Sequence, residues 1–246
     1  MKPAKVAAIG ASILALYLLR LDHAAGLYVD DAWYIVLAEA LGSGRGFRLI
    51  SSAAAPIVPP VPPGFAIILA PVVGLTPHFP DNVFALKAVS IAAMLGVGIG
   101  AYFYIARSYG TPRIVAAVVA IITVTLPAFV FLATSTVMAE AVFTVSQLLL
   151  AVMIERAAVK ESGRLTVLAG LIGGATLLIR LAAVASVGGA ALYLAWRRGF
   201  KSALTFAGVV CVCYAPWAWY SIANASTAAE RAAHGGSMAA QYSELL

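Results

Sequence analysis

Five charged side chains stand out in this apolar chain because they fall beside or inside stretches that are typical of membrane helices. In chain order they are Asp30, Asp31, Lys87, Glu140 and Arg180. A charge inside a membrane helix is costly and by default marks function. A carboxylate can accept a proton, and a Lys or Arg side chain can bind an anionic group such as a phosphate. We therefore expect a site for proton transfer and anion binding at one membrane boundary.

Each of these charges also has a purely structural interpretation. Asp30 or Asp31 can cap a helix, Lys87 can extend its ammonium to the interface without a ligand, and Glu140 with Arg180 can form a structural ion pair. The histidines have no partners at metal-ligand spacing. No metal site and no cofactor are therefore predicted, and the participation of a divalent metal stays open.

The composition predicts a membrane protein. Hydrophobic residues make up 63% of the 246, charged residues only 11%, and the mean hydropathy is +0.97. A soluble domain carries about a quarter charged residues because its exterior must face water. The net charge of +6 comes from basic residues that are scattered between apolar runs. Because a nucleic-acid site needs a dense basic patch, the sequence argues against nucleic-acid binding.

The apolar runs predict an all-α protein with about seven transmembrane helices. The predicted spans are Val6–Arg20, Val83–Ala106, Ile114–Leu132, Val137–Ile154, Leu165–Arg180, Leu181–Trp196 and Ser202–Ser221. Leu165–Trp196 could be a single helix, but that helix would be about 48 Å long against a hydrocarbon core of about 30 Å. We expect a tight hairpin near Arg180 instead.

The distribution of basic residues fixes the predicted orientation. Gly64–Thr76 is apolar but short and follows a proline cluster, so we expect at most a short helix there that does not cross the membrane. With the N-terminus cytoplasmic, ten of the 16 Lys and Arg residues then lie on the cytoplasmic side. Localisation in the plasma (inner) membrane follows, with the C-terminus external. A cleavable signal peptide at residues 1–25 is the alternative for the first span.

The first external loop, about residues 21–82, contains a predicted surface helix. It begins near Asp30 and Asp31, either of which can cap it, and ends at Gly42. Trp33 and its apolar neighbours recur at helical spacing, and Tyr34 follows. This pattern predicts an amphipathic helix that lies in the membrane interface, with its aromatic rings at the level of the headgroups.

Six motifs in this order resemble the GT-C superfamily, the membrane glycosyltransferases that use polyprenyl-phosphate sugars, such as protein O-mannosyltransferases and the lipid A aminoarabinose transferase. They are Asp30-Asp31-Ala-Trp33-Tyr34, Pro62-Pro63-Gly64-Phe65, Ala85-Leu-Lys87, Ser135-Thr-Val-Met138-Ala-Glu140, the glycine-rich span that ends in Arg180, and Pro216-Trp217 with Asn224. The resemblance covers nearly the whole chain as one transmembrane module, residues 1–246. It departs from the family at Asp31, where Glu is common, at Lys87, where Arg is common, and at Leu181, where Pro is common.

The resemblance implies transfer of a sugar from a polyprenyl-phosphate donor to an external lipid, glycan or protein acceptor, with inversion. It implies Asp30 as general base with Asp31 as the substitute, and Lys87, Glu140, Arg180, Trp33 and Tyr34 as substrate-binding residues. Family members usually continue beyond the seventh span, whereas this chain ends with a tail of about residues 222–246. Two other classes therefore stay open: a non-catalytic relative that binds the lipid carrier or a membrane partner, and a small transporter.

Overall fold

The computed structural model describes residues 3–51, 53, 55 and 61–224, and every regular element in these residues is a helix. The predicted all-α fold class is therefore confirmed. In chain order the helices are α1 (Pro3–Arg20), α2 (Val29–Gly42), α3 (Gly64–Leu75), α4 (Val83–Ser108), α5 (Arg113–Thr125), α6 (Pro127–Thr134), α7 (Glu140–Val159), α8 (Gly163–Ile179), α9 (Ala183–Arg198) and α10 (Phe200–Ala223).

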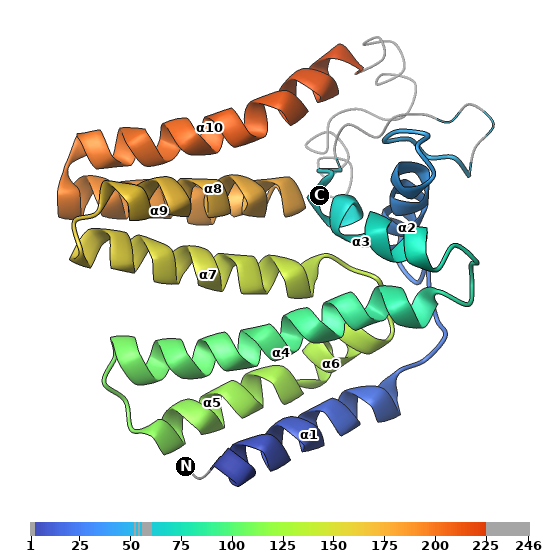
Figure 1. Cartoon of the computed structure of the whole chain (residues 1–246), viewed down its shortest axis with the longest axis horizontal. Helices are drawn as coiled ribbons and strands as arrows, with labels where there is room; N and C mark the ends of the chain where they lie inside the picture. The colour runs from blue at the N-terminus through green and yellow to red at the C-terminus, as the bar shows by residue number, and fades with distance from the viewer. Residues whose placement is uncertain (1–2, 52, 54, 56–60, 225–246) are drawn as a thin grey trace, which may run out of the picture.

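The long helices lie side by side, and α2 and α3 gather at one end of this array (Figure 1). Successive long helices run in alternating directions, so the start of α4 and the ends of α1, α8 and α10 all lie at the α2–α3 end. In the array α7 packs between α4 and α8, α10 packs on α8 and α9, and α1 packs on α6. The loops that join α4 to α5, α7 to α8 and α9 to α10 lie at the opposite end.

Three helices of the described chain are long and apolar enough to cross a membrane, namely α4, α7 and α10. The bent pair α5–α6 adds a fourth candidate if it is one span. Residues 8–20 of α1, and the whole of α8, form shorter apolar helices. The structure is therefore that of a helical membrane protein with three or four candidate spans, fewer than the seven that the sequence predicts.

The predicted single span Ile114–Leu132 is wrong as a continuous helix. The chain breaks at Leu126, and α5 and α6 meet at a bend of 53°. Pro127 begins α6 and has no N–H to continue the hydrogen bonding of α5. The buried Tyr17 hydroxyl donates to the Val124 carbonyl at 2.6 Å, so a side chain from α1 satisfies an acceptor at the end of α5.

Two predicted features of the second half hold, with shifted boundaries. The chain turns at Arg180, since α8 ends at Ile179 and α9 begins at Ala183, which confirms the hairpin. The predicted span Val137–Ile154 begins later, at Glu140. Glycine allows α8 to approach α10 closely, since a Cβ at Gly174 would lie 2.4 Å from the Cβ of Cys213.

Helices α2 and α3 pack on each other, and α3 also packs against α4 and α8. A helix is confirmed where the sequence predicts the surface helix, and its apolar face packs against protein. Tyr34, Leu37 and Ala38 are buried in one cluster with Phe65 and Leu69 of α3. At the start of α3 a Cβ on Gly64 would lie 2.6 Å from the Leu178 carbonyl oxygen of α8. The proline-rich motif therefore brings α3 against the end of α8, directly before Arg180.

Candidate functional site

Glu140 and Arg180 form an ion pair at the α2–α3 end of the array. Arg180 follows the last residue of α8 in an extended conformation, and its Nη1 donates to Oε1 of Glu140, the first residue of α7. Both side chains are partly exposed, Arg180 at 31% and Glu140 at 25%. The second carboxylate oxygen of Glu140 is buried and has no hydrogen-bond partner among the residues that the structure describes. An unpaired buried oxygen is costly, and a hydroxyl of a bound molecule would satisfy it.

Tyr34 lies within electrostatic range of this pair and of Asp30. Burial raises the pKa of the Tyr34 phenol to about 12, and the charges of Arg180, Asp30 and Glu140 also act on it. Tyr34 is buried, whereas Asp30 is exposed at the first turn of α2. The charges of three predicted residues thus act on Tyr34, and we call these three together with Tyr34 the outer cluster. They are Asp30, Tyr34, Glu140 and Arg180.

Asp31 is a buried structural carboxylate. Its Oδ2 accepts from the backbone N–H groups of Gly26 at 2.9 Å and Leu27 at 3.2 Å, and its Oδ1 accepts from Val137 at 2.9 Å. Burial raises the pKa of Asp31, and these three hydrogen bonds oppose the shift. Asp31 therefore ties the start of α2 to the segment before α7.

The predicted capping of α2 by Asp30 or Asp31 is wrong. The N-cap residue is Tyr28, which makes no side-chain capping bond. Asp31 reaches back to the loop before the helix and does not bond the first turn. Asp30 is thus left as the exposed carboxylate of the pair.

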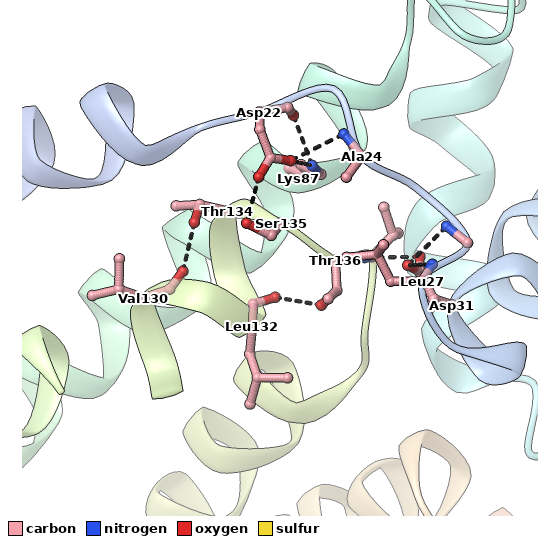
Figure 2. A network of polar contacts seen from close by, with 12 residues as sticks. Asp22, Ala24, Leu27, Asp31, Lys87, Val130, Leu132, Thr134, Ser135 and Thr136 are labelled. Atoms are coloured by element: carbon pink, nitrogen blue, oxygen red, sulfur yellow. Dashed lines mark hydrogen bonds and ion pairs between the residues drawn. The ribbon is translucent and has the colours of Figure 1, made fainter. Parts of the chain in front are cut away.

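Lys87 binds a carboxylate that the sequence analysis missed. Its ammonium donates to the carboxylate of Asp22 at 2.8 Å and to the Asp22 carbonyl at 2.7 Å (Figure 2). Ser135 donates to the other oxygen of Asp22 at 2.5 Å. Lys87 is fully buried, so it does not simply extend to the interface as one interpretation held. We call Asp22, Lys87 and Ser135 the latch, because they join the chain after α1 to α4 and to the end of α6.

The electrostatics of the latch favour an ionised Asp22. Desolvation alone would raise the pKa of Asp22, but hydrogen bonds from Lys87, Ser135 and the Ala24 amide outweigh it, so the pKa lies below its ordinary value. The charge of Lys87 also acts on Asp31. Among the described residues, no hydrogen bond or ion pair joins the latch to the outer cluster, so the predicted charges form two separate groups at the α2–α3 end of the array.

Aromatic side chains line the same end of the array. Trp33 is half-buried against the α2–α3 cluster, and the rings of Tyr34 and Phe65 meet edge to face at 5.0 Å. Trp217 of α10, from the last predicted motif, is buried between Phe47 at 5.1 Å and Tyr220 at 5.6 Å. Phe47 carries no signal in the sequence beyond its ring.

No group of three metal-ligating side chains occurs in the part of the chain that the structure describes. The tail from residue 225 onward lies outside the described residues. Comparisons of the chain with protein-family models, with curated proteins and with solved structures found no match.

Proposed function

We propose that this protein is a membrane glycosyltransferase that moves a sugar from a polyprenyl-phosphate donor to an external acceptor. In this proposal the chain crosses the plasma membrane seven times, through α1, α4, the pair α5–α6, α7, α8, α9 and α10. The N-terminus is cytoplasmic, and the α2–α3 end faces outward. The observation that carries the proposal is the outer cluster. In it Arg180 pairs with Glu140, whose second carboxylate oxygen has no hydrogen-bond partner among the described residues, and the exposed Asp30 acts on the same Tyr34 as this pair.

Arg180 is the proposed phosphate ligand. A guanidinium can bind one anion while it donates to another, and its planar fork matches a phosphate. Arg180 lies where α8 ends. The isoprenoid chain of a phosphate bound at that level can extend into the hydrocarbon beside the helices. The phosphate becomes the leaving group, and Arg180 stabilises the negative charge that develops on it.

Asp30 is the proposed general base. It takes the proton from an acceptor hydroxyl, whose oxygen forms a bond to the anomeric carbon while the bond from that carbon to the phosphate oxygen breaks. Attack from the side opposite the leaving group inverts the anomeric configuration. The free oxygen of Glu140 then accepts from a hydroxyl of the sugar, and the phenol of Tyr34 contributes a further polar contact.

The latch leads us to change the role proposed for Lys87. Its ammonium is already held by Asp22 and lies beneath the protein surface. We assign Lys87 a positioning role, in which it holds the loop before α2 and so sets the place of Asp30. Of the two predicted cations, Arg180 is then the proposed phosphate ligand.

A non-catalytic protein that binds the lipid carrier is the second candidate. The Glu140–Arg180 pair favours it, because a guanidinium that is already neutralised can bind a phosphate without any transfer. Donor turnover, as opposed to donor binding, distinguishes the two. A small transporter has less support, because the ion pairs near α2 and α3 lie at one end of the helices and not at their middle.

The test uses the full chain in liposomes with a panel of polyprenyl-phosphate hexoses and pentoses, and it follows release of polyprenyl phosphate in the presence of cell-envelope acceptors. Asp30→Asn should bind polyprenyl phosphate as wild type does. It should form polyprenyl phosphate from the sugar donor about 10²–10⁴-fold more slowly, which is the usual size of a general-base effect. The matched control is Asp81→Asn, an exposed aspartate in the same loop. Arg180→Ala should weaken polyprenyl-phosphate binding, and Arg180→Lys should restore it only in part.

Equal turnover by wild type, Asp30→Asn and Asp81→Asn would remove Asp30 from the mechanism. Binding of polyprenyl phosphate without turnover of any donor would favour the second candidate. Unchanged binding in both Arg180 variants would leave the Glu140–Arg180 pair with a structural role only.

A further inference from the structure

A polar cleft lies at the end of the array opposite α2 and α3, outside the proposed active site. Its volume is about 400 Å³, and residues of α4, α7 and α9 line it. Since α7 packs against both α4 and α9, it forms the floor of the cleft. The side chains used below are Tyr104, Tyr109, Gln147, Glu155, Ser186 and Tyr193.

Two tyrosines pack edge to face and together form one aromatic wall of the cleft. The rings of Tyr104 and Tyr109 lie 5.8 Å apart with their planes at 89°, and Tyr193 lines the cleft from α9. Tyr109 is 70% exposed, whereas Tyr104 and Tyr193 are half-buried. Aromatic faces carry partial negative charge, and walls of this kind attract cations.

Glu155 supplies a full negative charge beside these rings. Its Oε2 accepts from Ser108 at 3.0 Å, and its side chain interacts with Tyr104. None of the ion pairs among the described residues includes Glu155. Two basic side chains near this end stack elsewhere: Arg107 lies over the Phe103 ring at 5.0 Å, and Arg197 lies over Trp196 at 5.8 Å. The carboxylate in the cleft is therefore available to pair with a cation of a bound molecule.

Uncharged residues line the deep part of the cleft. Leu150, Ala151 and Ile154 of α7 line it together with Ala190 of α9. Gln147 lies eight residues before Glu155, about 12 Å deeper along the helix, and donates to Ser186 at 3.4 Å. A molecule that fits this cleft is cationic at the mouth and apolar further in.

We propose that this cleft binds the ammonium headgroup of a phospholipid. The ammonium pairs with Glu155 and lies against the Tyr104–Tyr109 pair, while the glycerol and acyl chains follow the apolar wall of α7 and α9. The site does not depend on the proposed glycosyl transfer.

The experiment is native mass spectrometry of the full chain released from vesicles of equal parts phosphatidylethanolamine and phosphatidylglycerol. Wild type should retain phosphatidylethanolamine preferentially, and Glu155→Gln should reduce that preference about tenfold, the effect of losing roughly 1.4 kcal/mol. Glu161→Gln, an exposed glutamate at the same end and outside the cleft, should leave it unchanged. Tyr104→Phe should retain most of the preference because the ring remains, and Tyr104→Leu should lose it.

Variants are compared only where circular dichroism and gel filtration match wild type, and Tyr104→Phe keeps the test available if Tyr104→Leu does not fold. Equal retention of the two lipids by wild type would overturn the proposal, as would equal losses in Glu155→Gln and Glu161→Gln. Displacement of phosphatidylethanolamine by soluble ethanolamine at matched concentration would overturn the lipid assignment, since the amine alone would then bind as well.

Discussion

Burial separates the acidic residues near α2 into different roles. Asp31 accepts three backbone N–H groups and is fully buried, whereas Asp30, the adjacent residue, is exposed. A carboxylate whose acceptor sites are already used is a poor base for a substrate hydroxyl, because proton transfer would cost its hydrogen bonds. Asp22 is likewise engaged by Lys87 and Ser135. Asp30 is thus the aspartate best able to meet a substrate.

The latch gives the protein a predicted pH dependence. The pKa of Asp22 is lowered in the folded protein, so its ionised form contributes stability above about pH 4, and that contribution is lost as pH falls through the folded pKa. Asp22→Asn should lower the free energy of unfolding by about 1–3 kcal/mol near neutral pH. Its melting temperature, measured by scanning fluorimetry, should approach that of wild type toward about pH 3. Asp81→Asn serves as the control, and a constant difference over the same range would contradict an ionised latch.

At the scale of helices, the sequence predicts an element correctly where the residues at its ends determine where it begins or stops. The prolines before Gly64 and the turn at Arg180 predicted the short α3 and the α8–α9 hairpin, and both are present. Pro127 itself indicates a break in the helix, but the apolar residues around it favoured the prediction of one continuous span. The pairing of Asp22 with Lys87 was not predictable, because it joins residues 65 positions apart through tertiary packing.

Close packing of α3 on α8 should be sensitive to one methyl group. Gly64→Ala places a Cβ 2.6 Å from the Leu178 carbonyl oxygen, so α3 must shift, and we expect a loss of about 1–3 kcal/mol in stability. Because Leu178 lies two residues before Arg180, the variant should also weaken polyprenyl-phosphate binding. Gly74→Ala is the matched control in the same helix, since a Cβ there meets nothing within 4 Å. Equal melting temperatures and equal lipid binding in the two variants would show that this contact does not order the site.

For the whole molecule, the alternation of helix directions connects the outer cluster, the latch and the charge distribution. The predicted cytoplasmic basic residues within the described helices and loops, such as Arg113, Arg164 and Lys201, belong to the end of the array that lacks α2 and α3 (Figure 1). The outer cluster and the latch lie at the other end. If each long helix crosses the membrane, the positive-inside rule directs the proposed active site outward and the tyrosine-lined cleft toward the cytoplasm.

This orientation predicts which positions an impermeant thiol reagent can label. In a background of Cys211→Ala and Cys213→Ala, which removes both native thiols, single cysteines are placed at Ser51, Ser162 and Asn224. Ser51 lies in the first long loop, Ser162 lies between α7 and α8, and Asn224 follows α10. In intact cells Ser51→Cys and Asn224→Cys should be labelled, and Ser162→Cys should be labelled only after the membrane is permeabilised.

Labelling of Ser51→Cys and Ser162→Cys from the same side would require an even number of crossings between them, whereas α4, α5–α6 and α7 together supply three. That result would remove the external location of the outer cluster, and with it the proposed external acceptor.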